Sequence, residues 1–273
     1  MQKIIVAIGG GENGRISGSG EKKPYETLEI DREIVKLSRK DRPHFLLLAH
    51  SQIPWGEESE IKYFDTMKKI YGDIFGCDCR LLKISELKDH FQKAIDDVEW
   101  ADIIYEGGGD TFDMINLWRD TGFDKLLKTA WQDGKVMCGI SAGAIAWFSL
   151  GNTKDPRFIN EACNKIEGLG FIDAYVSPHC QSDGKRESEI RSLKYIDKIG
   201  LSLSNCSAIE IIDDEYRIIK SVPDDKNFNP YVLKTYWKED KCFEEELLES
   251  IDFQSLRDLL SKNNEKDKAQ EFW

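Results

Sequence analysis

The run Val136-Met137-Cys138-Gly139-Ile140-Ser141-Ala142-Gly143-Ala144-Ile145 decides how this chain is expected to fold. Its apolar start predicts a buried strand, its glycines a sharp turn, and its alanine-rich end a helix. A G-x-S-x-G turn in that context projects a serine hydroxyl above a sheet, beside backbone N–H groups and a helix N-terminus. The alternative is a small-residue turn where a helix packs closely on a strand, and the pattern alone does not separate the two.

Apolar runs alternate with amphipathic segments on both sides of this turn. Further strands are predicted over 3–8, 44–49, 79–84, 101–106 and 171–179, and helices over 26–39, 60–75, 85–98 and 186–198. Such alternation predicts an α/β fold of the flavodoxin-like kind, with a mainly parallel sheet sandwiched between helices.

The last third of the chain departs from this alternation. A β-hairpin is predicted over 207–219, then a strand over 231–237 and a short helix over 253–260, and the polar end 262–273 is expected to fray. We expect a single α/β domain over 1–273, with a C-terminal extension of about 220–273 packed on it.

Composition excludes several classes of function. The 273 residues carry a net charge of -12 without a Lys/Arg-dominated stripe, which argues against nucleic acid. No apolar stretch approaches the length that spans a bilayer, so no membrane association is expected. The 7 cysteines lack C-x-x-C spacing, which favours reduced thiols in the cytoplasm and no metal site. Packing is the expected role of Cys138 and Cys180. Gly9-Gly10-Gly11 lacks both nucleotide-loop spacings, so no cofactor is expected.

A second glycine turn, Gly107-Gly108-Gly109, follows strand 101–106. Carboxyl ends of parallel strands share one edge of a sheet, so this turn and Ser141 are expected to lie together. The N–H of Ala142, with that of Gly108 or Gly109, would then stabilise an oxyanion. A simple tight strand-to-helix turn is the alternative interpretation of these glycines.

Acyl transfer also needs a base for the serine proton. His179 ends a predicted strand and is the best candidate among the 4 histidines. His50 follows another strand and competes, although a loop hydrogen bond is the commoner role there, and His90 is expected in solvent. Asp155, in a polar loop, is our choice for the acid that orients His179.

The segments Gly107-Gly108-Gly109-Asp110-Thr111, Gly139 to Ala144 and Pro178-His179 together resemble peptidase E, the aspartyl dipeptidase family of serine peptidases. The resemblance covers about residues 1–215. It implies a fold related to class I glutamine amidotransferases, with serine in place of cysteine, and hydrolysis of short peptides that begin with aspartate.

Carried onto this sequence, the resemblance implies Ser141 as nucleophile, His179 as base and Asp155 in the charge-relay loop. It implies that Arg186 receives the aspartyl carboxylate of the substrate and that Asp110 and Thr111 lie at the substrate. A surface arginine paired with Glu187 or Glu189 is the alternative for Arg186.

This sequence also departs from the family. Asn205, in Leu203-Ser204-Asn205-Cys206, stands where peptidase E has an acid, and Glu210 is nearby but offset. The third catalytic residue therefore stays open between Asp155, Glu210 and none. Two other functions also stay open: a cyanophycinase-like hydrolase of aspartyl-arginine polymers, and a non-catalytic binding module on the same scaffold. The expected partner is a small peptide, and a homodimer is left open.

Overall fold

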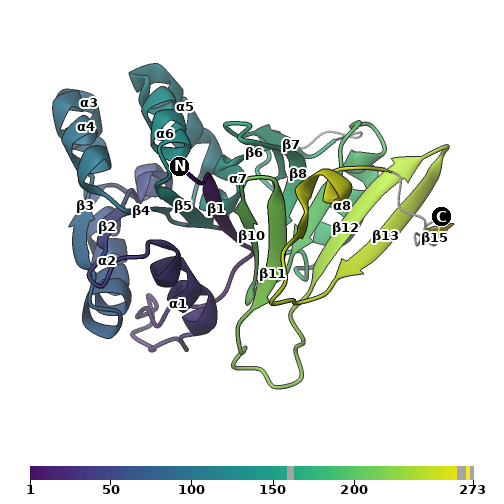
Figure 1. The fold of residues 1–273 in the computed structure, drawn as a ribbon, viewed down its shortest axis with the longest axis horizontal. Helices are drawn as coiled ribbons and strands as arrows, with labels where there is room; N and C mark the ends of the chain where they lie inside the picture. Colours follow the sequence, from purple (N-terminus) through teal and green to yellow (C-terminus); the bar gives the residue numbers. More distant parts are fainter. Residues whose placement is uncertain (159–162, 263–268, 271–273) are drawn as a thin grey trace.

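The computed structural model describes residues 1–158, 163–262 and 269–270. An 8-stranded sheet, ordered β14-β11-β10-β1-β5-β4-β2-β3, forms one half of the molecule (Figure 1). Its strands are β1 (Ile4–Ile8), β2 (His44–Leu47), β3 (Asp78–Leu81), β4 (Ile103–Glu106), β5 (Val136–Ile140), β10 (Ser207–Ile212), β11 (Glu215–Lys220) and β14 (Gln254–Ser255). Strands β1 to β5 pair in parallel, whereas β10, β11 and β14 extend the sheet antiparallel.

Helices cover both faces of this sheet. They are α1 (Leu28–Leu37), η1 (His50–Trp55), α2 (Glu57–Lys68), η2 (Lys69–Ile74), α3 (Ile84–Asp89), α4 (Phe91–Trp100), α5 (Thr111–Thr121), α6 (Phe123–Gln132) and α7 (Ala142–Ala146). Successive side chains of a strand point to opposite faces. Ile4 and Val6 therefore pack in one core with Ile30 of α1, while Ile5 packs in another with Trp118 of α5.

A 7-stranded second sheet, ordered β15-β13-β12-β9-β8-β6-β7, forms the other half (Figure 1). It comprises β6 (Phe148–Asn152), β7 (Lys165–Glu167), β8 (Ile172–Pro178), β9 (Gly200–Leu203), β12 (Val232–Lys238), β13 (Lys241–Leu247) and β15 (Ala269–Gln270), with helices α8 (Lys185–Leu193) and α9 (Leu256–Leu259). Strand β8 is parallel to both β6 and β9. Val176 and Leu201 of this sheet join the same core as Ile5, so the two sheets share a hydrophobic interior.

The predicted α/β class, the helix-covered parallel sheet and the β10–β11 hairpin are confirmed. The expectation of one main sheet was wrong, because strand 171–179 lies in the second sheet as β8. Phe148 to Asn152 form β6, although a polar loop was expected from residue 151. The expected fraying of 262–273 falls mostly outside the described residues.

The C-terminal segment adds strands to both sheets. Strands β12, β13 and β15 lie in the second sheet, and β14 pairs with β11 in the first.

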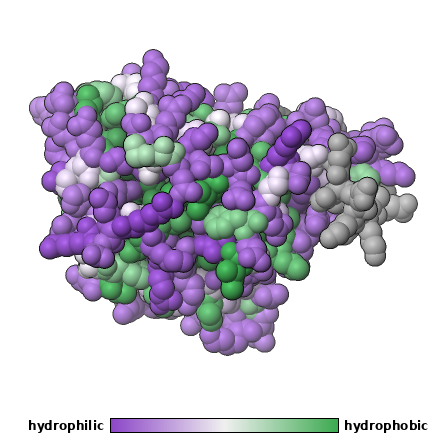
Figure 2. All heavy atoms as spheres, in the orientation of Figure 1, coloured by the Kyte–Doolittle hydropathy of each residue, from purple (hydrophilic) through white to green (hydrophobic). Residues whose placement is uncertain are grey.

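The face shown in Figure 2 is mainly hydrophilic, with hydrophobic residues in small groups between the polar ones. Of the helices in the described part of the chain, none has the length and apolar character needed to cross a membrane. Within the described residues no cysteine forms a disulfide, and Cys138 and Cys180 are buried.

Candidate active site

Ser141 occupies the turn between β5 and α7 in a strained backbone conformation. Its φ is 58° and its ψ is -109°, a region that residues with a side chain rarely adopt. Its amide donates to the Ile8 carbonyl of β1 at 3.1 Å, so the turn is fixed to the centre of the first sheet. A strained backbone at a serine on a sharp strand-to-helix turn is typical of a catalytic nucleophile.

The glycines around Ser141 are required by close backbone packing. A Cβ on Gly139 would lie 2.6 Å from the Gly143 carbonyl, and one on Gly143 would lie 2.2 Å from the Glu106 carbonyl oxygen. The Gly143 amide donates to the Gly107 carbonyl at 3.0 Å and ties the two glycine turns together. The close packing expected of a small-residue turn is therefore present, and it holds Ser141 in its strained conformation.

The second glycine turn lies directly against the serine. A Cβ on Gly108 would be 3.3 Å from Ser141 Cβ and 3.8 Å from its Oγ. The Gly108 amide donates to the Tyr63 hydroxyl at 3.2 Å, whereas the amides of Gly109 and Ala142 donate no hydrogen bond within the described residues. Gly109 and Ala142 are thus the amides free to stabilise an oxyanion beside Ser141.

The carboxylate of Glu106 holds the second glycine turn in place through hydrogen bonds, a role that was not predicted from the sequence. Its buried carboxylate accepts hydrogen bonds from the amides of His50, Ser51 and Gly107 at 3.2, 3.1 and 3.0 Å. Burial raises the pKa of Glu106 to about 7, although these hydrogen bonds favour the charged form and oppose the shift. The sequence signal for this role was a glutamate at the end of a buried strand, directly before three glycines.

His179 joins the site through the Gly9-Gly10-Gly11 run after β1. The His179 amide donates to the Gly9 carbonyl at 3.0 Å, one residue beyond Ile8, which holds Ser141. A Cβ on Gly10 would lie 2.4 Å from the His179 ring. The amide of Cys206 also donates to Gly10, at 2.9 Å. These glycines are therefore where the two sheets meet and where the serine and histidine segments are brought side by side.

Asn205 orients the His179 ring. The ring Nδ1 lies 2.7 Å from Asn205 Oδ1. An amide oxygen only accepts hydrogen bonds, so Nδ1 carries the proton and Nε2 is left as the basic nitrogen. Burial lowers the pKa of His179, the Asn205 hydrogen bond opposes this, and the charge of Lys185 adds to it. A neutral imidazole with a basic Nε2 is the form that a general base needs.

Asp155 lies in a different network from His179 in this structure. Its carboxylate accepts from Arg157 Nε at 2.7 Å, which lowers the pKa of Asp155. Arg157 also pairs with Asp110 at 2.5 Å, and Asp110 caps α5 by accepting from the Asp113 amide at 2.8 Å. The structure thus gives Asp155 and Asp110 a shared arginine and gives His179 an asparagine instead.

Arg186 is held by protein groups on α8 and on the second sheet. Its guanidinium pairs with Glu189 at 3.2 Å and with Glu244, and it donates to Ser202 at 3.0 Å and Thr235 at 2.8 Å. Pairing with Glu189 is the alternative that the sequence left open. Two carboxylates already neutralise this cation in the structure.

The remaining candidates are accounted for by packing and pairing. His50 is buried and accepts from Trp118 Nε1 at 2.8 Å through Nδ1, and burial lowers its pKa to about 3. Glu210 is paired with Arg217 at 2.8 Å. Thr111 is buried at the start of α5, and His90 is exposed as expected.

Comparison with known proteins agrees with this geometry. The sequence model of Peptidase family S51 matches residues 15–219, about three quarters of the chain. The chain belongs to peptidase family S51. It is therefore a serine-type peptidase that acts on peptides, and the resemblance to peptidase E seen in its motifs is confirmed. The uncharacterized peptidase YgaJ of Bacillus subtilis (strain 168) is 28% identical over 216 residues, covering 78% of this chain and 85% of YgaJ.

Solved structures show the same fold. A peptidase from an acI-B1 Actinobacterium superposes with a TM-score of 0.67 at 16% identity, covering 93% of this chain and 97% of the other. A candidate peptidase E protein from Listeria monocytogenes EGD-e gives 0.56 at 16% identity, covering 81% and 99%. At this identity the likeness concerns the fold.

Proposed function

We propose that this S51 peptidase cleaves short peptides after an N-terminal aspartate, using Ser141 as nucleophile. The observation that carries the proposal is the strained Ser141 turn, whose neighbouring β1 residues also anchor His179. The His179 ring is set by Asn205 so that Nε2 is the basic nitrogen. The proposed catalytic group is thus Ser141-His179-Asn205, with an amide in the place of the expected acid.

The reaction follows from these positions. Ser141 Oγ attacks the carbonyl carbon while its proton moves to His179 Nε2, and the Gly109 and Ala142 amides stabilise the oxyanion. The C–N bond then breaks as His179 returns that proton to the leaving amine. A water molecule, deprotonated in turn by His179, attacks the ester carbonyl and releases the aspartyl carboxyl product together with the serine hydroxyl.

Selectivity for aspartate needs a cation near His179, and α8 offers two. Arg186, the expected receptor, is already paired with Glu189 and Glu244. Its neighbour Lys185 is buried and donates to the Asn152 carbonyl at 2.7 Å, and burial lowers its pKa to about 8. Lys185 forms no ion pair within the described residues, so we favour it as the partner for a substrate carboxylate.

One assay tests the proposal: hydrolysis of Asp-Leu, Asn-Leu and Leu-Leu by the wild-type protein and by Ser141→Ala. We expect cleavage of Asp-Leu alone, abolished in Ser141→Ala. Equal cleavage of Asn-Leu and Asp-Leu would refute aspartate selectivity while leaving the peptidase reaction intact. Release of leucine by Ser141→Ala at the wild-type rate would refute the nucleophile.

The same peptides separate the two cations. Lys185→Met should reduce the preference for Asp-Leu over Asn-Leu about tenfold, the effect of one charged hydrogen bond. Arg186→Met should mainly lower thermal stability, because it leaves the buried Glu189 unpaired. A loss of aspartate preference in Arg186→Met, with the preference kept in Lys185→Met, would instead make Arg186 the partner of the substrate carboxylate.

A polymer of aspartyl-arginine would need an acidic groove for its arginines. The cavity beside the oxyanion turn has Arg15, Lys62 and Lys69 in its lining against a single carboxylate, Asp65. This charge favours the aspartyl dipeptidase reaction over the cyanophycinase-like one. The cytoplasmic location remains a prediction from the sequence, and a homodimer stays open.

A further inference from the structure

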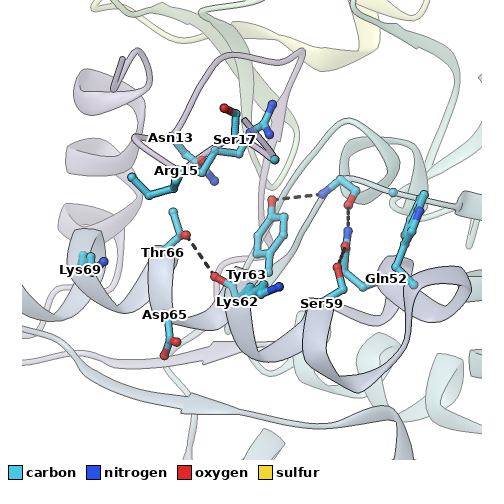
Figure 3. A pocket seen from close by; sticks show the side chains of 15 residues that line it. Asn13, Arg15, Ser17, Gln52, Ser59, Lys62, Tyr63, Asp65, Thr66 and Lys69 are labelled. Atoms are coloured by element: carbon cyan, nitrogen blue, oxygen red, sulfur yellow. Dashed lines mark hydrogen bonds between the residues drawn. The ribbon is translucent and has the colours of Figure 1, made fainter. Parts of the chain in front are cut away.

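A cavity of about 860 Å³ opens beside the oxyanion turn, and the catalytic steps above use only the Gly109 amide at its edge. Its walls come from the loop 12–26, from η1, α2 and the start of η2, and from Gly108 and Gly109 (Figure 3). Tyr63 of α2 lies at the junction, since its hydroxyl accepts the hydrogen bond from the Gly108 amide. A ligand in this cavity would therefore lie next to the scissile bond.

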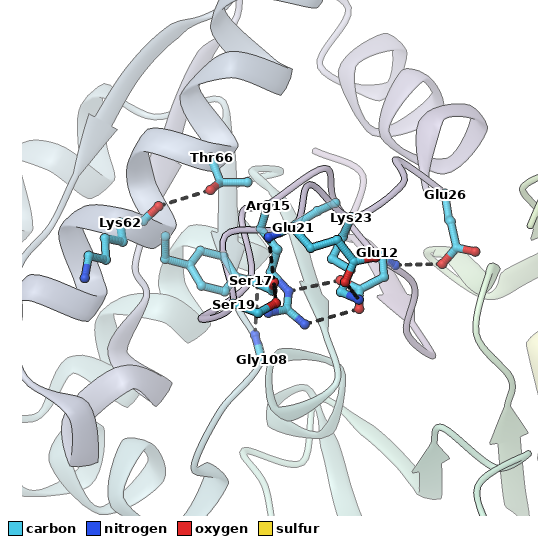
Figure 4. A network of polar contacts seen from close by, with 12 residues as sticks. Glu12, Arg15, Ser17, Ser19, Glu21, Lys23, Glu26, Lys62, Thr66 and Gly108 are labelled. Atoms are coloured by element: carbon cyan, nitrogen blue, oxygen red, sulfur yellow. Dashed lines mark hydrogen bonds and ion pairs between the residues drawn. The ribbon is translucent and has the colours of Figure 1, made fainter. Parts of the chain in front are cut away.

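The loop 12–26, here called the flap, has a hairpin-like structure of its own. Its backbone pairs with itself in hairpin fashion, with Gly14 donating to Pro24 at 2.8 Å and Lys23 donating to Arg15 at 2.9 Å. Where the flap begins and ends, the Glu12 amide donates to the Glu26 carboxylate at 2.9 Å (Figure 4). The protein's own hydrogen bonds thus hold the flap wall.

The cavity opens directly from the serine turn. Gly108 and Gly109 line it, and a Cβ on Gly108 would lie 3.3 Å from Ser141 Cβ. Lys185 and Arg186, the candidate partners of the aspartyl carboxylate, do not line it. The cavity is therefore left for the part of the peptide that departs.

The cavity carries positive charge in an acidic protein. Its lining holds three cationic side chains, those of Arg15, Lys62 and Lys69, and one carboxylate, that of Asp65. Arg15 pairs with Glu12 at 3.0 Å and Lys62 with the exposed Glu58 at 2.7 Å. The exposed Lys62–Glu58 pair contributes about 0–1 kcal/mol, so a ligand carboxylate can replace it. Arg15 uses Nε and Nη2 for Glu12, and its Nη1 forms no hydrogen bond in the described part of the chain. Lys69 forms no ion pair among the residues described.

The cavity also carries exposed apolar side chains. Ile16 on the flap is 61% exposed and Trp55 of η1 is 59% exposed, although both are large and hydrophobic. Both line the cavity together with Tyr63. Apolar and aromatic walls with a few charged groups are typical of a ligand site, and this volume falls within the usual range of about 300–1,000 Å³.

We propose that this cavity binds the leaving part of the peptide, as an apolar or aromatic residue that ends in a free carboxylate. The apolar side chain packs against Trp55 and Ile16, and the carboxylate pairs with Arg15 and Lys69. The inference rests on the proposed function, in which an N-terminal aspartate leaves one residue on the acyl side. A cavity of this size then belongs to the residues that follow the scissile bond.

Steady-state hydrolysis of Asp-Phe, Asp-Phe amide and Asp-Ala tests this. We expect kcat/KM for Asp-Phe to exceed that for Asp-Phe amide about tenfold, as for one charged contact. In the doubly substituted Arg15→Met, Lys69→Met protein this ratio should approach one, and Trp55→Ala should reduce the preference for Asp-Phe over Asp-Ala. Lys128→Met, an exposed lysine on α6, is the matched control and should change neither. An unchanged acid-to-amide ratio in the double variant would overturn the proposal.

A binding experiment separates this inference from the proposed function. Calorimetry on Ser141→Ala uses Gly-Phe and Gly-Phe amide, which have no aspartate and cannot be cleaved by that protein. Tighter binding of the acid, lost in Ser141→Ala that also carries Arg15→Met and Lys69→Met, supports the site even if wild type cleaves no Asp-X peptide. Equal binding of acid and amide would refute the site while Asp-X hydrolysis could still stand.

Discussion

Ser141 and His179 reach the site from two sheets that are built in different ways. The serine turn is packed backbone against backbone, with Gly139 and Gly143 in contact with carbonyl groups of the first sheet. The histidine is held mainly by single hydrogen bonds, from its amide to Gly9 and from its ring to Asn205. A change on the serine side should therefore cost stability and activity together, whereas a change on the histidine side should cost activity alone.

Gly143→Ala should have the largest effect. The added Cβ would lie 2.2 Å from the Glu106 carbonyl oxygen, which cannot move without disturbing β4. We expect a loss of about 3 kcal/mol in the free energy of unfolding, together with loss of hydrolysis. Urea unfolding followed by circular dichroism measures the first, and wild-type stability in this variant would contradict the packing argument.

Gly10→Ala should separate activity from stability on the other side. Its Cβ would lie 2.4 Å from the His179 ring and 2.1 Å from Asn205 Oδ1, two side chains that can turn aside. Displacing the imidazole by about 1 Å should lower kcat about 100-fold, with a much smaller change in unfolding free energy than in Gly143→Ala. An equal loss of unfolding free energy in Gly10→Ala and Gly143→Ala would contradict the claim that the serine and histidine sides differ in packing.

Asn205→Asp should move the pH profile. A carboxylate at Nδ1 favours the charged imidazolium and raises the pKa of His179, which burial otherwise lowers. The base must be neutral, so activity at the acid end should be lost at a higher pH than in wild type, by about one unit. Asn205→Ala is the control: it should reduce kcat about tenfold without an upward shift. A profile of kcat/KM that does not move in Asn205→Asp would remove Asn205 from the site.

Glu106, on the serine side, gives a prediction about the pH dependence of stability alone. Its pKa of about 7 in the folded protein exceeds its ordinary value of 4.5, so the folded state holds the proton more tightly. The free energy of unfolding should therefore fall by ~3 kcal/mol as pH rises from 4.5 to 7. Glu106→Gln, compared by urea unfolding at both pH values, should lose this dependence. The same slope in wild type and variant would contradict the assignment.

The same contrast explains what could be predicted from the sequence. Apolar strands and glycine turns identified the first sheet, and the Ser141 turn lies between β5 and α7, because short-range packing requires small residues at fixed spacing. The second sheet was missed because β6 ends in a glycine and an asparagine that look like a loop, and β9 begins with a glycine and contains a serine.

Side-chain partners were harder to predict than elements. Asp155 and Arg157 are two residues apart, so their pairing could have been predicted locally, whereas we expected Asp155 to orient His179. Asn205 reaches His179 only because the chain between them returns through α8 and β9. No local pattern reports such a long-range contact, nor the pairing of Arg186 with Glu244 across the second sheet.

A double-mutant cycle on kcat/KM for Asp-Leu tests most directly whether the serine and histidine act as one unit. Groups that act together are strongly non-additive when removed. We predict that Ser141→Ala, His179→Ala and the double variant lose hydrolysis to nearly the same extent. Losses that multiply in the double variant would show that the two residues act independently and would contradict this account.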